Sequence, residues 1–199
     1  ESNWSTGTLP GVSDDVLINV AGDVTVTHST AAHSVRSLYS QNAVVLSGGT
    51  LTVSNTLQVN NGLTLIGGTL RGATVLPGSG GQGIIATSSG GTLDGVTVNG
   101  SLDVGRQNNG ANLTVVNGLV LNGTLYLGNA TNSWWGQVGF VGTQTLGGNG
   151  TVILGNQGTC NALRVDTAGT TLTIGSGITV RGHSGQIGQS TGCIGSPAN

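Results

Sequence analysis

Residues that could carry out acid–base chemistry are few in this 199-residue sequence. It contains seven acidic residues, five arginines, three histidines and no lysine. Asp14 and Asp15 are adjacent, but neighbouring residues of a strand point to opposite faces. Asp94 and Asp103 stand nine positions apart, and we expect them on different faces of the fold. The carboxylates are better explained as turn and end-capping groups, so we predict no catalytic residue and no enzymatic activity.

The sequence also lacks the patterns that bind metals or phosphates. The histidines are His28, His33 and His183, and the first two have no cysteine or carboxylate at the spacing of a zinc site. Glycine pairs recur with the period of the apolar residues, and they lack the lysine of a phosphate-binding loop. We therefore predict no metal site and no cofactor.

Trp134 and Trp135 are the one local feature that breaks the background, because aromatic residues make up only 3% of the chain. On a strand, one ring would point inward and the other outward. An outward ring could pack as a lid over the fold, contact a protein partner or stack on a sugar. The sequence leaves these three roles open.

Cys160 and Cys193 are the two cysteines, so a single pairing exists. In an oxidising compartment a disulfide would connect the end of the chain to an earlier segment. The alternative is two buried free thiols. We predict the disulfide because the composition suits an extracellular protein.

Six Asn-x-Ser/Thr sequences are present. They begin at Asn3, Asn99, Asn112, Asn122, Asn129 and Asn149. Most contain glycine or lie at predicted turns, so turn chemistry explains them without glycosylation.

Alternating apolar triplets define the elements that must position all these residues. Three of them begin six residues apart: Leu51-Thr-Val53, Leu57-Gln-Val59 and Leu63-Thr-Leu65. Alternation is typical of a strand, and the Ser, Asn and Gly between the triplets favour turns. Strands bent into one coil and stacked on the next would bury a continuous interior. We expect the Leu and Val side chains to be buried and the Thr and Gln between them to be exposed.

The sequence thus predicts an all-β, single-domain parallel β-solenoid. Three triplets with their turns need about 18–22 residues per coil, which gives about nine or ten coils. The solenoid is predicted at residues 24–181, with an N-terminal arm or cap at 1–23 and a C-terminal arm or cap at 182–199. We expect right-handed coils, since a left-handed hexapeptide helix requires a stricter period.

The first coils resemble a known family. Trp-Ser-x-Gly, Pro-x-x-x-Asp-Asp-Val-x-Ile, Gly-Asp-Val-Thr-Val and Gly-Gly-Thr-Leu-Thr-Val resemble the opening of bacterial surface and secreted proteins with autotransporter-type β-strand repeats. The matching residues are Trp4, Ser5, Gly7, Pro10, Asp14, Asp15, Val16, Ile18, Gly22, Asp23, Val24, Thr25, Val26 and Gly48 to Val53. The resemblance implies a right-handed parallel β-helix, but a fold does not define an activity.

An extracellular or cell-surface structural protein is the leading functional hypothesis. Charged residues are only 6% of the chain, and 36% are hydrophobic, which argues against disorder. The arms at 1–15 and 182–199 could add a strand to the edge of a neighbouring subunit and so form a head-to-tail homopolymer. In the first arm, Trp4, Leu9 and Val12 are the expected contacts. Alternatively, the arms cap their own coil, or the chain is a module of a longer rod.

Two other functions stay open. The first is an adhesin module that binds glycans or a host through loops 77–92, 105–112 and 128–137. The second is a carbohydrate-active β-helix enzyme. A net charge of −2 without a basic cluster argues against a nucleic-acid partner. No apolar run approaches the roughly 18 residues of a membrane span.

Overall fold

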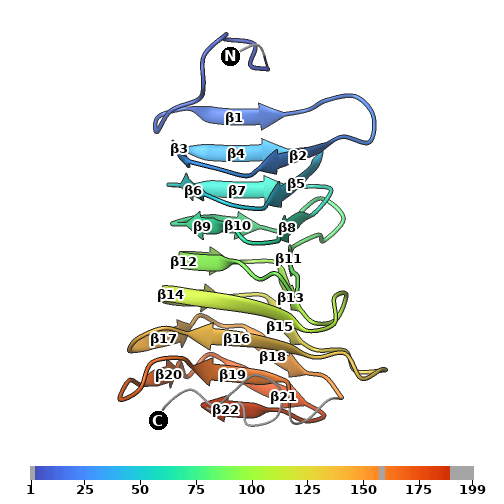
Figure 1. Cartoon of the computed structure of the whole chain (residues 1–199), viewed down its shortest axis with the longest axis vertical. Helices are drawn as coiled ribbons and strands as arrows, with labels where there is room; N and C mark the ends of the chain where they lie inside the picture. The colour runs from blue at the N-terminus through green and yellow to red at the C-terminus, as the bar shows by residue number, and fades with distance from the viewer. Residues whose placement is uncertain (1–2, 157–159, 189–199) are drawn as a thin grey trace.

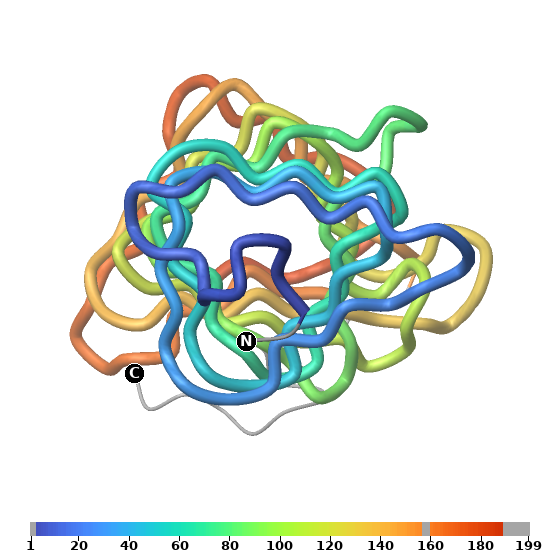
Figure 2. The backbone as a smooth tube through the Cα atoms, turned by 90° about the horizontal axis from the view of Figure 1, so that it is seen from above, coloured from blue at the N-terminus to red at the C-terminus, as the bar shows by residue number. Residues whose placement is uncertain are grey.

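The computed structural model describes residues 3–156 and 160–188. Every regular secondary-structure element in these ranges is a β-strand (Figure 1). Each strand pairs in parallel with strands of the adjacent turns, so the chain forms a parallel β-solenoid, as the sequence predicted. The solenoid has about seven turns. Seen from the N-terminal end, the chain runs clockwise as it moves away from the viewer (Figure 2). The coil is therefore right-handed, as expected for crossovers between parallel strands.

The strands of the described residues stack in three columns that follow from their pairing. The first column contains β1 (Asp15–Ile18), β4 (Ser37–Ser40), β7 (Thr56–Val59), β10 (Thr74–Leu76), the second halves of β12 (Thr92–Val98) and β14 (Ala111–Leu121), β17 (Gln144–Gly147) and β20 (Leu172–Ile174). The second column contains β2 (Thr25–His28), β5 (Ala43–Leu46), β8 (Leu63–Leu65), β11 (Ile84–Ala86), β13 (Ser101–Val104), β15 (Thr124–Leu127), β18 (Thr151–Leu154) and β21 (Thr179–Gly182). The third column contains β3 (Ala32–Val35), β6 (Thr50–Val53), β9 (Thr69–Arg71), the first halves of β12 and β14, β16 (Gly136–Phe140), β19 (Ala162–Val165) and β22 (Gln186–Gly188).

β12 and β14 each turn a corner of the solenoid and so join the first and third columns into one sheet. In β12 the pairing register shifts between Asp94 and Val96, where Gly95 has a φ of 60°. In β14 the corner lies at Asn117 and Gly118, which both have positive φ. Glycine and asparagine adopt this left-handed conformation at the lowest cost.

The solenoid has fewer turns than the nine or ten that we expected, because its later turns are longer. Leu57 pairs with Val75, 18 residues further along, whereas Leu146 pairs with Ile174, 28 residues further along. The expected number of turns assumed the same length for every turn. Additional residues enter the loops between columns, where they leave the strand stacking unchanged.

The interior follows the predicted alternation. Its six predicted members are buried: Leu51, Val53, Leu57, Val59, Leu63 and Leu65. Thr52, Gln58 and Thr64 are half-buried, although we expected them to be exposed. Side chains on the outer face stack on those of the layers above and below, about 4.8 Å away, and these neighbours cover part of their surface.

Three of the Asn-Gly-Ser/Thr sequences form a stack at one corner of successive layers. Asn122 Nδ2 donates a hydrogen bond of 2.9 Å to Asn99 Oδ1, and the backbone N–H of Asn149 donates one of 3.2 Å to Asn122 Oδ1. These sequences therefore have a structural role, in line with the expected turn chemistry.

The paired layers extend beyond residues 24–181. β1 already pairs with β4, and β22 pairs with β19. Residues 3–14 precede the first layer. Among the described residues there is no apolar helix of the length that a bilayer requires.

Candidate functional site

The N-terminal end of the solenoid presents unpaired strand edges. β1, β2 and β3 form the first layer, and each pairs with a described strand on one side only. An open edge exposes a row of backbone N–H and C=O groups that can pair with another strand. Within the described residues, one side of this layer is therefore left without a paired strand.

Residues 3–14, here called the cap segment, lie across this end of the coil (Figures 1 and 2). Trp4 packs against the apolar core, and Gly7 and Asp14 close local turns through backbone hydrogen bonds to Trp4 and Gly11. The predicted arm thus lies back on its own coil. Leu9 and Val12, however, leave 49% and 69% of their surfaces exposed.

Exposed apolar side chains gather at this end. Besides Leu9 and Val12, Leu17 on β1 is 63% exposed and Val20 after it is 50% exposed. A groove of about 450 Å³ lies between the cap segment and β1, with Thr8 and Leu17 among its lining residues. Apolar patches that a folded chain leaves in water are typical of interaction surfaces.

The charges of the first layer are mostly acidic. Asp15 accepts a hydrogen bond of 2.8 Å from Arg36 Nε, and this interaction lowers the pKa of Asp15 and raises that of Arg36. Asp14 accepts a hydrogen bond of 2.7 Å from the backbone N–H of Gly11. Asp14 and Asp23 form no ion pair within residues 3–156 and 160–188. The carboxylates of Asp14, Asp15 and Asp23 therefore outnumber the single guanidinium of Arg36 at this end.

The opposite end carries the opposite charge. Arg164 pairs with Asp166 at 2.9 Å. Arg181, on the last strand of the second column, is exposed and forms no ion pair with a described residue. The last described layers thus hold one more guanidinium than carboxylates, and the two ends of the rod are electrostatically complementary.

Trp134 and Trp135 lie in a second candidate site, formed by two adjoining loops. Trp135 packs on Gly110, and the Gly110 N–H donates a hydrogen bond of 2.9 Å to the Trp135 carbonyl oxygen. Asn129 Nδ2 donates to the carbonyl oxygen of Arg106 at 2.9 Å. Trp135 is half-buried, whereas Trp134 is 38% exposed. One ring thus fixes the loops and the other faces solvent.

A buried carboxylate holds one of these loops in place. Asp103 accepts hydrogen bonds from the backbone N–H groups and side chains of Arg106 and Gln107, at 2.8–3.2 Å. The Arg106 guanidinium lies 4.0 Å from the centre of the Tyr126 ring. Asp94 belongs to a different sheet, which confirms that the two carboxylates are on separate faces.

The three histidines lie at different ends of the rod. His183 lies after β21, while His28 and His33 contact each other at the N-terminal end. Within the described ranges, no three His, Cys, Asp or Glu side chains are close enough to hold a metal ion. Cys160 is buried and its thiol is not free. Cys193 lies outside the described residues, so their pairing stays a prediction.

Sequence reasoning missed two members of the apolar surface, Leu17 and Val20. The signal for Leu17 was present. Val16, Leu17 and Ile18 are three consecutive apolar residues, and a strand with two of them inward must point the third outward. Val20 follows the strand in a loop, where no periodicity indicates its direction.

We also compared the chain with protein-family models, curated proteins and solved structures, and no match was found in any of the three.

Proposed function

We propose that this protein is a structural β-solenoid whose copies stack end to end, the first layer of one on the last layer of the next. The resulting filament would lie outside the cell or on its surface. The observation that supports this most strongly is the group of exposed apolar side chains beside the unpaired edges of the first layer.

The geometry of a parallel solenoid suits this contact. The strands of a column all run in one direction, so β20, β21 and β22 at the last layer have the same direction as β1, β2 and β3. Another copy can continue each column without a change in strand polarity. Because the joined surfaces are unlike, the contact propagates as an open filament.

Apolar and charged side chains at the two ends support the same head-to-tail contact. At the C-terminal end, Ile174, Ile178 and Val180 are only partly buried, although they pack against the core. The first layer of a second copy would cover these side chains. The same contact would cover Leu17 of that second copy. The acidic first layer would meet the end that carries Arg181, which favours the head-to-tail orientation over contacts between like ends.

The proposal is tested with a pair of double variants. Val12→Lys/Leu17→Lys places two charges on the proposed contact, as natural proteins do to protect sheet edges. Val120→Lys/Val141→Lys adds the same charge in the middle of the rod, at side chains that are also exposed. In sedimentation velocity over a concentration series, we expect wild type and the mid-rod variant to form larger species and the first variant to stay monomeric. A monomeric wild type at every concentration, or equal behaviour of the two variants, would contradict the proposal.

Glycan binding is a second candidate, favoured by the two-loop site. Trp134, Trp135 and Tyr126 are three of the six aromatic residues of the chain. The side-chain oxygens of Asn132 and Asn109 accept hydrogen bonds from the backbone N–H groups of Trp134 and Trp135. An exposed ring beside hydrogen-bonding amides is suited to a sugar face. Trp134→Ala should then abolish retention on a glycan array, whereas Tyr39→Ala on the first column should not. If the array retains both Trp134→Ala and Tyr39→Ala, the result argues against this site.

A further inference from the structure

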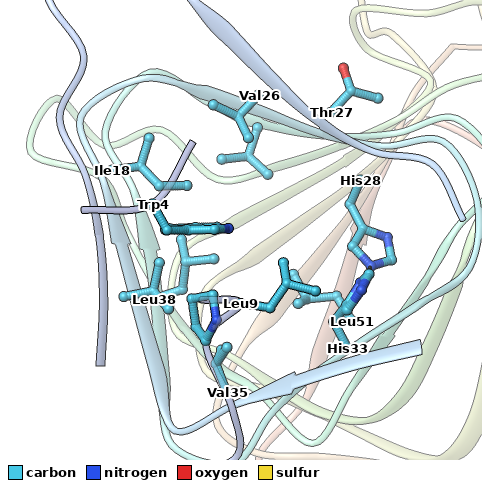
Figure 3. Close-up of a pocket in the computed structure, with 13 residues that line it drawn as sticks. Trp4, Leu9, Ile18, Val26, Thr27, His28, His33, Val35, Leu38 and Leu51 are labelled. Atoms are coloured by element: carbon cyan, nitrogen blue, oxygen red, sulfur yellow. Dashed lines mark hydrogen bonds between the residues drawn. The ribbon is translucent and has the colours of Figure 1, made fainter. Parts of the chain in front are cut away.

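The N-terminal end contains an apolar cavity of about 200 Å³ that is partly open to solvent (Figure 3). Trp4 and Leu9 of the cap segment form one side of it. Ile18, Val26 and Leu38 of the first two layers form much of the rest. The lining is almost entirely apolar, and its polar groups include the imidazoles of His28 and His33 and the indole N–H of Trp4.

The first layer, which lines this cavity, differs from the second at two aligned positions. His28 aligns with Leu46 of the next layer, and His33 aligns with Leu51. Two positions that hold leucine in the second layer thus hold imidazoles in the first. The two rings contact each other edge to face, with 5.1 Å between their centroids, and both line the cavity.

The hydrogen bonds of the His28–His33 pair determine which ring nitrogen can accept a hydrogen bond from a ligand. His28 Nδ1 is 2.9 Å from the carbonyl oxygen of Gly48, which can only accept, so this nitrogen carries a proton. In the neutral pair, His28 Nε2 then accepts from His33 Nδ1, 3.0 Å away. His33 Nε2 is left as an acceptor without a hydrogen-bond partner among the described residues.

From this geometry we infer that the cavity binds a small, neutral, single-ring molecule with one hydrogen-bond donor, such as a phenol. An apolar cavity of about 150 Å³ is sufficient for benzene, so the volume admits one ring. A charged ligand would lose its hydration without compensation. The donor of the ligand pairs with His33 Nε2, and the ring contacts Trp4 and Leu9. The site lies within one chain and does not depend on the proposed assembly.

The test compares phenol with anisole, its methyl ether, which has a similar shape but no donor. Binding is followed by ligand-observed NMR at a protein concentration at which sedimentation shows a monomer. We expect saturable binding of both, with phenol about fivefold tighter, the effect of one net hydrogen bond. Val26→Phe fills the cavity and should abolish binding of both probes.

His33→Leu is the second variant, and it restores the residue type of the layer below. It should keep the affinity for anisole and lose the preference for phenol. The change in preference distinguishes a His33 that accepts a hydrogen bond from the ligand from a His33 that only supports the fold. It also tests the proposed site if Val26→Phe does not fold. Absence of saturable binding to wild type, equal binding to Val26→Phe, or an unchanged preference in His33→Leu would overturn the inference.

Discussion

At the scale of single residues, Asp94 shows how a carboxylate connects successive layers. Asn117 Nδ2 donates a hydrogen bond of 2.7 Å to one of its oxygens, and Arg71 Nε donates one of 2.6 Å to the other. Arg71 lies one turn before Asp94 and Asn117 one turn after it. The hydrogen bond from Asn117 and, to a smaller extent, that from Arg71 lower the pKa of Asp94 despite its burial.

This geometry predicts a pH-dependent effect of Asp94→Asn. Because the pKa is lower in the folded chain, ionised Asp94 stabilises the fold above the unfolded value of 3.8, and this contribution is lost as the pH falls through the folded-state pKa. At neutral pH the variant should lower the free energy of unfolding by about 1–3 kcal/mol. In urea titrations at decreasing pH, its difference from wild type should shrink in acid.

Asp23→Asn is the matched control, because Asp23 has no ion pair with a described residue. It should unfold like wild type throughout the series. A deficit of Asp94→Asn that is the same at neutral and acid pH would show that the charge is not what stabilises the layer.

The partners of Asp94 could not be predicted from the sequence, although its separation from Asp103 could. Alternation and the turn between β12 and β13 are enough to separate the two carboxylates. The contacts to Arg71 and Asn117 depend instead on pairing registers across turns of 23 residues each, which are set by loop lengths without periodicity.

At the scale of the elements, the turns limit which residues fit. Gly123, between β14 and β15, lies over Gly100, between β12 and β13. A Cβ at Gly123 would be 1.8 Å from the carbonyl oxygen of Gly100. The corners of neighbouring layers are thus in direct backbone contact, and the frequency of glycine in this sequence follows partly from such contacts.

Gly123→Ala should therefore destabilise the solenoid by about 1–3 kcal/mol, since the backbone must move to remove the overlap. Gly147→Ala on β17 is the control, because a Cβ there meets nothing closer than 3.8 Å and the φ of Gly147 is not positive. Chemical denaturation gives both values. A control as unstable as Gly123→Ala would mean that the close approach is not the cause.

Strands were predictable here because their signal is local, whereas turn lengths were not. The triplets starting at Leu51, Leu57 and Leu63 have the buried–outward alternation of β6, β7 and β8. Nothing in the Gly- and Ser-rich segments between later strands indicates how many residues a loop will take. The fold class could therefore be derived from sequence, and the number of turns was overestimated.

At the scale of the whole molecule, the rod has two different ends, and this asymmetry is the basis of the proposed assembly. The first layer exposes Leu17 beside an acidic group of side chains, and the last described layer exposes Arg181. The sequence indicated Trp4, Leu9 and Val12 as contacts on an assembly arm. Trp4 packs against the core instead, which leaves Leu9 and Val12. In the structure they are exposed on a segment that covers its own coil, so the same residues would act from the cap segment.

Electron cryo-microscopy of the concentrated protein tests the proposed stacking most directly. Eight described strands in the second column, at about 4.8 Å each, correspond to a minimum axial rise of about 38 Å per subunit, because the cap segment lies outside these strands. We predict unbranched filaments one subunit wide with a repeat of at least this length, absent from Val12→Lys/Leu17→Lys. Separate short rods in wild-type samples, or rods joined only along their sides, would contradict it.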